Sequence, residues 1–179
     1  IVHRDVTPAN VLVDVEGHVV LADFGIAQTR LDATNPKGGI VTVRGNFPYL
    51  APELYRGAEP SPATDVYSAA VTLHELLTGR NELAGGAPNE TMARVLGRVP
   101  RRIDALRRDV PAELADVLEK ALAKEPGARF ASGTELADAM RAVRLVTSDR
   151  AQEMLEQRVA RDFRDPRFAT LTATPPLPE

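Results

Sequence analysis

The longest hydrophobic segment of the chain, between Ala63 and Thr78, carries apolar residues on every side of a helical pattern. It ends at Gly79, a residue that commonly terminates helices. A helix that is apolar all round is buried at the centre of a domain. The pattern therefore predicts a central helix with apolar positions at Val66, Tyr67, Ala69, Ala70, Val71, Leu73, Leu76 and Leu77.

Two later segments have the spacing of amphipathic helices, with one apolar face each. Pro111 is a start signal for the first, and Ser132-Gly133-Thr134-Glu135 has the form of a capping box that opens the second. A shorter helix is predicted within residues 91–96. The apolar positions are Leu114, Val117, Leu118, Ala121 and Leu122 in the first segment, and Leu136, Met140 and Val143 in the second.

The first quarter of the chain has a different pattern. Two short β-favouring runs, residues 11–13 and 19–22, flank Glu16-Gly17, which predicts a hairpin with a glycine turn. Residues 28–48 hold several Gly and Pro residues among polar ones, which predicts a long loop. Loops of that length within a compact domain usually serve a function.

The composition is that of an ordinary globular domain. The chain has 179 residues, about one domain, with 44% hydrophobic and 26% charged residues. A net charge of -3 without any block of Lys or Arg argues against nucleic acid as a partner. The absence of cysteine excludes disulfides, zinc–thiolate sites and thiol nucleophiles.

The sequence shows no membrane segment, because no apolar run approaches the roughly 20 residues that span a bilayer. No signal peptide opens it, so we expect a cytoplasmic protein, with an anchor outside this sequence left open. The first residue is Ile, so we expect a piece of a longer protein. Residues 148–163 are predicted to form a peripheral charged helix, and residues 170–179 a proline-containing disordered tail.

Three short motifs carry candidate chemistry. Asp5 can accept a hydrogen bond from a hydroxyl nucleophile, Asn10 returns to the same side of a tight loop, and Asp23 follows the second predicted strand. Carboxylate and amide oxygens are the hard donors that Mg²⁺ prefers. Taken singly, each residue has a simpler reading as a helix cap, a loop residue or a turn. The motifs are His3-Arg4-Asp5-Val6-Thr7-Pro8-Ala9-Asn10, Asp23-Phe24-Gly25 and Ala51-Pro52-Glu53.

Together, in this order and spacing, the motifs resemble the catalytic half of a protein kinase, of the bacterial serine/threonine type. The resemblance implies an α+β protein-kinase-like fold, of which this chain is the mainly α-helical C-terminal lobe with a small β-hairpin and no N-terminal lobe. The lobe covers residues 1–146, and residues 147–179 are peripheral. The implied activity is the transfer of the ATP γ-phosphoryl group to Ser or Thr hydroxyls of protein substrates, with ATP and Mg²⁺ as cofactors.

The resemblance also assigns roles to individual residues. Asp5 is the catalytic base, Asn10 and Asp23 are magnesium ligands, and Leu12 lies beneath the adenine. The remaining assignments are structural or regulatory. His3 stacks with Phe24, next to Gly25, and Arg4 meets a phosphate or acidic group. Glu53 pairs with Arg129, and Asp65 accepts backbone N–H groups from the catalytic loop. Thr42 is the leading phosphorylation candidate, with a β-favouring loop residue as the alternative.

Two positions depart from the family pattern, because Thr7 stands where these kinases usually have Lys and Asn46 where they usually have Thr. We expect both side chains to donate hydrogen bonds to Asp5, which leaves a slower or differently tuned kinase. A pseudokinase that serves as a binding scaffold is the alternative, and an inactive fragment is a second one. The glycine-rich loop and strand lysine of the family cannot be located in this sequence, so we expect the chain alone to be inactive.

Overall fold

The computed structural model describes residues 1–14, 17–24 and 47–143. These residues fall into two compact units. The first comprises residues 1–10, 23–24 and 47–143, and the second comprises residues 11–14 and 17–22. The first unit is helical, and the second is a two-stranded hairpin.

The hairpin pairs β1 (Val11–Val13) with β2 (Val19–Leu21) in antiparallel register, with Val11 opposite Leu21. Gly17 has a φ of 85°, in the left-handed region that glycine adopts without strain. The carboxylate of Asp14 supports the turn, because its Oδ1 accepts the His18 backbone N–H at 2.8 Å. The predicted hairpin and its glycine turn are therefore confirmed.

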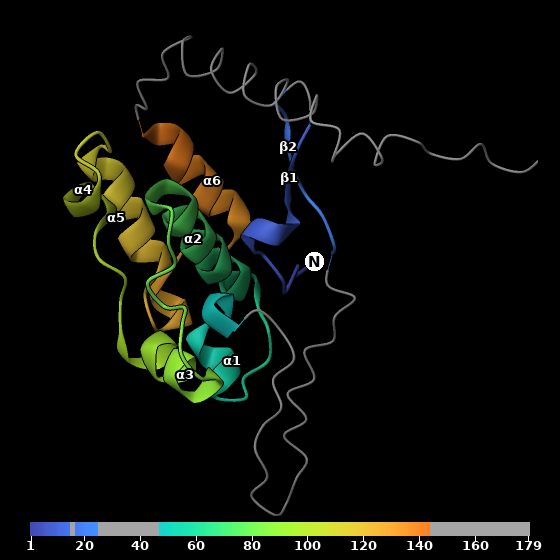
Figure 1. Cartoon of the computed structure of the whole chain (residues 1–179). Coiled ribbons are helices and arrows are strands. Elements are labelled where there is room, and N and C mark those ends of the chain that lie inside the picture. Colours follow the sequence, from blue (N-terminus) through green and yellow to red (C-terminus); the bar gives the residue numbers. More distant parts are fainter. Residues whose placement is uncertain (15–16, 25–46, 144–179) are drawn as a thin grey trace, which may run out of the picture. The chain divides into compact units, whose positions relative to one another are not determined.

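The helical unit is built around α2 (Figure 1). This helix contacts α4, α5 and α6, while α1 contacts α3. Three 3₁₀ turns complete the unit: η1 (Pro8–Asn10), η2 (Phe47–Tyr49) and η3 (Pro126–Ala128). The helices are α1 (Pro52–Tyr55), α2 (Pro62–Thr78), α3 (Pro88–Gly97), α4 (Ile103–Leu106), α5 (Ala112–Ala121) and α6 (Gly133–Ala142).

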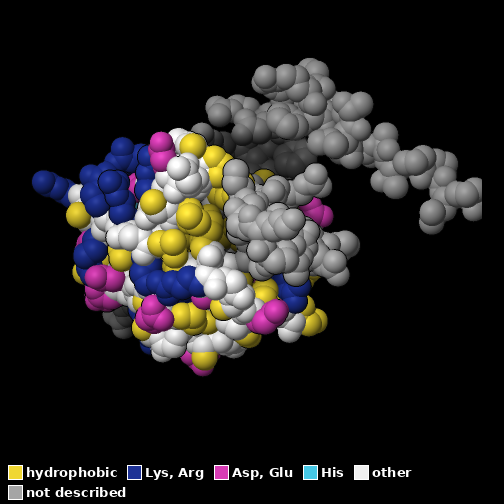
Figure 2. All heavy atoms as spheres, turned by 90° about the horizontal axis from the view of Figure 1, so that it is seen from below, with side chains coloured by type: hydrophobic (Ala, Val, Ile, Leu, Met, Phe, Trp, Pro, Cys, Tyr) yellow, Lys and Arg dark blue, Asp and Glu magenta, His cyan; other side chains and the backbone are white. Residues whose placement is uncertain are grey.

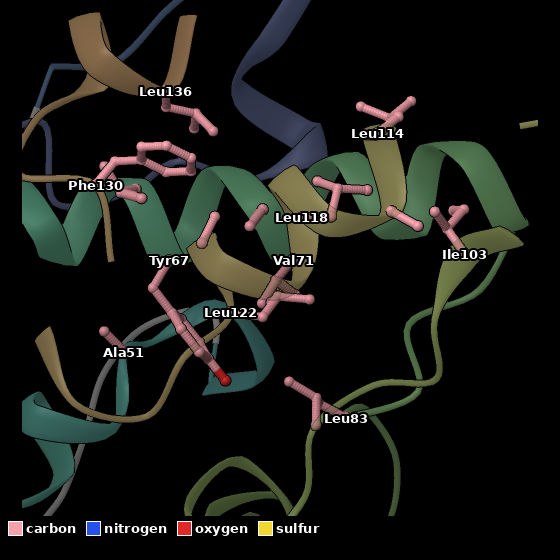
Figure 3. Packing of buried hydrophobic residues seen from close by; sticks show 14 of the residues in the cluster. Ala51, Tyr67, Val71, Leu83, Ile103, Leu114, Leu118, Leu122, Phe130 and Leu136 are labelled. Carbon is pink, nitrogen blue, oxygen red and sulfur yellow. The ribbon is translucent and has the colours of Figure 1, made fainter. Parts of the chain in front are cut away.

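The prediction that the segment before Gly79 is a central helix is confirmed. Tyr67 and Val66 are almost fully buried, and Gly79 ends the helix with a φ of 74°. The C-terminal end of α2 departs from the prediction of an apolar helix buried on every side, since Leu76 is 55% exposed. Figure 3 shows side chains of α2, α5, α6 and the segment before α6 converging on one core, including Tyr67, Val71, Leu118, Leu122, Phe130 and Leu136.

The two amphipathic helices are also confirmed, as α5 and α6. One detail of the expected capping box differs: the Ser132 hydroxyl accepts the Glu135 N–H, but Glu135 returns its side chain to the N–H of Ala131. Helix α3 begins at Pro88, before the predicted start, because Pro is well suited to the first helical position. The four-residue helices α1 and α4 are too short to leave a periodic signal.

Several predictions concern residues outside the described ranges. They are most of the loop at 28–48, the helix at 148–163, the tail at 170–179 and the domain boundary after residue 146. The last two positions of that loop are described and lie in η2. Within the described ranges, no helix combines the length and apolar character that crossing a membrane requires.

The packing predicts that replacing two leucines, one buried and one exposed, has very different effects on the free energy of unfolding. Leu118 is 2% exposed in the core of α5, so Leu118→Ala should lower the free energy of unfolding by about 2–5 kcal/mol through lost contacts and a cavity. Leu76→Ala is the matched control at an exposed position, with an expected change within about 0.5 kcal/mol. Urea unfolding followed by circular dichroism measures both, and equal effects would contradict the central core described above.

Candidate active site

The loop that holds Asp5 is attached to α2 by one carboxylate. Asp65, in the first turn of α2, accepts the His3 N–H at 2.6 Å and the Arg4 N–H at 2.8 Å. Arg4 has a φ of 71°, a left-handed conformation that costs an L-residue about 1–2 kcal/mol. Hydrogen bonds to a charged group contribute about 1.5–3 kcal/mol each, enough to offset this strain. The predicted contact between Asp65 and this loop is confirmed.

A second attachment follows seven residues along the same helix face. The hydroxyl of Thr72, which is buried, donates to the backbone oxygen of Val6 at 3.0 Å. Sequence reasoning missed this contact. The signal that could have revealed it is a Thr within an apolar helix, whose buried hydroxyl needs an acceptor. Asp65 and Thr72 together fix the backbone on both sides of Asp5.

Asn10 returns to the same side of the loop as Asp5, as the five-residue spacing predicts, and hydrogen bonds that were not predicted join the two residues. The Nδ2 of Asn10 donates to the Asp5 backbone oxygen at 2.8 Å and to Asp5 Oδ2 at 2.9 Å. The turn η1 makes this return possible, because the Asn10 N–H bonds to the oxygen of Thr7 at 3.0 Å. Since an amide nitrogen cannot ligate a cation, Oδ1 of Asn10 is the atom left to serve as a hard oxygen ligand.

The prediction that Thr7 donates a hydrogen bond to Asp5 is wrong. The Thr7 hydroxyl has no hydrogen-bond partner among the described residues, and the side chain is only 2% exposed. The donor that reaches Asp5 Oδ2 is instead the amide of Asn10. The Thr7 side chain is directed into the buried interior, so its hydroxyl does not bond to the half-buried Asp5 carboxylate. Asn46, the other expected donor, lies outside the described residues.

Asp23 and Phe24 lie in the helical unit, directly after the hairpin. The rings of His3 and Phe24 are 4.5 Å apart at 48°, which confirms the predicted stack. Asp23 is exposed and has a φ of 56°, so its conformation is strained like that of Arg4. Within the described ranges no three His, Cys, Asp or Glu side chains gather to hold a metal, and a ligand set of Asn10 and Asp23 stays a prediction.

A buried ion pair confirms the expected partnership of Glu53 and Arg129. Two parallel bonds join them, Nη2 to Oε2 at 2.7 Å and Nη1 to Oε1 at 2.8 Å. The Arg129 side chain is fully buried and that of Glu53 is 8% exposed. The hydroxyl of Thr64 donates a third bond to Glu53 and accepts the N–H of Ser61, so the pair also fixes the start of α2.

Every donor of the Arg129 guanidinium has an acceptor. Besides the two bonds to Glu53, it donates to the backbone oxygens of Ala63, Ala123 and Lys124 at 2.7–2.9 Å. Five N–H groups therefore meet five acceptors, which is the condition under which a buried arginine is tolerated. Burial alone raises the pKa of Glu53, but the hydrogen bonds from Arg129 and the positive charge of Arg129 bring it below its ordinary value.

Three other predicted residues are not placed with this site. Gly25 and Thr42 lie outside the described ranges, so their roles stay predictions. Leu12 belongs to the hairpin unit, where it is 54% exposed. Arg4 has an exposed side chain, as a residue that meets a charged group on another segment requires.

The ion pair predicts a pH-dependent loss of stability. Glu53→Gln should lower the free energy of unfolding by about 3–5 kcal/mol at pH 7, because the Arg129 charge stays buried without its counterion. The pKa of Glu53 is lowered on folding, so its stabilisation is complete above the ordinary value of 4.5 and is lost as the pH falls through the lowered value. The difference in free energy of unfolding between wild type and Glu53→Gln should therefore decrease at acid pH.

Urea unfolding between pH 3 and pH 8 measures this gap. Glu125→Gln is the control, because Glu125 pairs with Arg56 at the surface and is 72% exposed, so a change within about 1 kcal/mol is expected. A loss of unfolding free energy in Glu53→Gln that does not depend on pH, or that equals the loss in the control, would contradict a stabilising buried ion pair.

Comparison with known proteins agrees with this geometry. Residues 1–149 match the protein kinase domain family. A serine/threonine-protein kinase of Corynebacterium efficiens (drp72) is 35% identical over 81% of this chain, which spans 27% of that protein. The kinase PknA of Mycobacterium tuberculosis is 39% identical over 80% of this chain and 32% of PknA. The kinase PknB of Mycolicibacterium smegmatis is 37% identical over 76% of this chain and 22% of PknB.

The chain thus spans between about a fifth and a third of the length of these relatives. The match includes the loop from His3 to Asn10, the buried pair of Glu53 and Arg129, and the helices between them. The family match therefore covers all of the described residues as well as the short motifs. This chain belongs to the protein kinase family, and the relatives it resembles are bacterial serine/threonine kinases.

Proposed function

We propose that the chain is the C-terminal lobe of a protein kinase that transfers the γ-phosphoryl group of ATP to Ser or Thr hydroxyls of protein substrates. The observation that carries the proposal is the bond of Asn10 to both the carboxylate and the backbone of Asp5. It fixes the Asp5 carboxylate on a loop that α2 holds at two further points. Phosphoryl transfer depends on positioning more than on covalent chemistry, so a preorganised carboxylate suits this reaction.

In this proposal Asp5 accepts the proton of the substrate hydroxyl and orients its oxygen toward the phosphorus atom. Asn10, through Oδ1, and Asp23, through its exposed carboxylate, would hold Mg²⁺. The bound ion neutralises charge on the phosphate oxygens. His3 supports Asp23 indirectly, by stacking on the neighbouring Phe24. Leu12, Gly25, Arg4 and Thr42 keep the roles that the resemblance gives them, as proposals.

A pseudokinase, which has the kinase fold but does not transfer phosphate, is the second candidate function, and one observation favours it. Thr7 is buried, with an unpartnered hydroxyl among the described residues, so it offers neither a cation nor a hydrogen bond to Asp5. Losing one preorganised electrostatic contact can cost about 10²–10³ in rate. A pseudokinase would bind ATP without transferring phosphate, whereas the kinase proposed here transfers it at a reduced rate.

The test is phosphate transfer from radiolabelled ATP to a Ser/Thr peptide library, carried out with the longer parent protein. Asp5→Asn should lower the rate by at least about 10²-fold, because it removes the proton acceptor and retains the shape. Asp138→Asn is the matched control, since Asp138 is an exposed residue of α6 whose ion pair is with the exposed Arg141, and the rate of this variant should stay within twofold of wild type.

Circular dichroism shows whether each variant is folded. Equal rates for the Asp5 variant and wild type would refute the catalytic role, and ATP binding without transfer by the wild type would establish the pseudokinase. We expect negligible transfer by the 179 residues alone, because no glycine-rich phosphate loop is recognisable in the sequence.

A further inference from the structure

A pocket of about 560 Å³ lies between the loop that follows α2 and the loop that follows α3. It is separate from the Asp5 site, because α2 rises about 20 Å between Asp65 and its last residue, Thr78. Its volume falls within the range of ligand pockets and exceeds what a single inorganic anion fills. Residues 80–83 line one side and residues 98–101 the other.

One carboxylate organises the arginines of this pocket. Glu82 Oε1 accepts bonds from Nε and Nη2 of Arg101 at 2.8 and 2.6 Å, and Glu82 Oε2 accepts the Arg101 N–H at 3.0 Å. Arg80 approaches the same carboxylate at 3.4 Å. The hydrogen bonds from Arg101 lower the pKa of Glu82, so this carboxylate stays ionised and holds the guanidinium in place.

The backbone on both sides of the pocket is also fixed. The Nε2 of His74, which is buried in α2, lies 2.8 Å from the backbone oxygen of Arg101. The hydroxyl of Thr78 donates to the backbone oxygen of Arg80 at 2.9 Å. The two loops are therefore tied to α2, and the pocket is preorganised.

The pocket carries more positive charge than its one acidic residue can neutralise. The pocket is lined by Arg80, Arg98 and Arg101 and by one acidic residue, Glu82, which leaves an excess of two positive charges on a chain whose net charge is -3. Within the described part of the chain, the Arg98 side chain makes no hydrogen bond or ion pair. Figure 2 shows Lys and Arg side chains gathered at the upper left of the face it displays.

Two neighbouring arginines outside the pocket, Arg102 and Arg107, do have acidic partners. Arg102 contacts three acidic side chains, those of Asp104, Asp116 and Glu119. Arg107 has Asp109 as its partner. Arg98 in the pocket therefore differs from these two arginines, because no acidic side chain among the described residues pairs with it.

We propose that this pocket binds a phosphorylated Ser or Thr side chain of a protein segment, together with the residues that flank it. A phosphomonoester carries about two negative charges, which matches the excess, and the guanidinium fork pairs with its oxygens bidentately. The flanking residues account for the remaining volume and meet the apolar wall at Val99, which is 53% exposed. Phosphorylated protein is the product of the proposed reaction and is therefore a source of the ligand. Only this origin of the ligand rests on the proposed function; binding by the pocket does not.

The test is fluorescence anisotropy with the full 179-residue chain in 0.15 M NaCl. The probe is the labelled peptide Ala-Ala-pThr-Ala-Ala, compared with its unphosphorylated form. We expect the phosphopeptide to bind at least tenfold more tightly. Arg98→Glu and Arg80→Glu should each weaken that binding at least tenfold. Arg108→Glu is the matched control, because Arg108 is exposed, lies outside the pocket lining and should change binding by less than twofold.

Circular dichroism verifies that each variant is folded, and Arg98 is informative here because it has no described partner to lose. Equal binding of the two peptides, or an Arg98→Glu variant that behaves like the Arg108 control, would overturn the proposal. Inorganic phosphate that binds as tightly as the phosphopeptide would overturn the assignment to a protein segment. The assay needs no catalysis, so Asp5→Asn should bind the phosphopeptide like wild type, and the two proposals can fail separately.

Discussion

The arrangement of this site depends on the contact between the Asp65 carboxylate and the backbone of the loop that holds Asp5. The carboxylate projects from a helix that is buried on most of its surface, so its position is set by the core. By accepting two consecutive backbone N–H groups, it stabilises a left-handed residue in the middle of the loop. The direction in which the chain leaves that residue then determines where Asp5 and, through the turn η1, Asn10 are placed.

The buried pair of Glu53 and Arg129 performs a similar task at another part of the helical unit. Its five acceptors come from α1, the start of α2 and the segment after α5, so one guanidinium joins three stretches that are distant in sequence. Buried ion pairs contribute little net stability compared with apolar packing, but they are costly to break. The pair therefore favours one arrangement of these segments over looser alternatives.

The sequence predicted the elements whose signals are local. The hairpin, α2, α5 and α6 follow from short-range periodicity and from turn and capping residues. The proximity of Asp5 and Asn10 was predicted from their five-residue spacing in a tight loop, whereas the hydrogen bond between them was not. The contacts of Asp65, of Glu53 with Arg129 and of His3 with Phe24 were expected from the family resemblance rather than from spacing.

The hydrogen-bond partners of threonine hydroxyls were the main feature that the sequence did not predict. Thr72, Thr64 and Thr7 have the same side chain, yet the first two join distant segments and the third is unpartnered among the described residues. Their partners are decided by tertiary packing, which leaves no periodic trace. The sequence did not predict the arginine pocket for the same reason, since residues 80–83 and 98–101 come from separate loops and no motif connects them.

Amide hydrogen exchange at His3 and Arg4 examines the Asp65 contact directly. With Asp65 in place, both amides should exchange slowly, and Asp65→Ala should accelerate them at least tenfold because it removes both acceptors. The amide of Leu118, within α5, is the internal reference and should change much less. Exchange at His3 and Arg4 that is already fast in the wild type, or that does not respond to the substitution, would contradict the account.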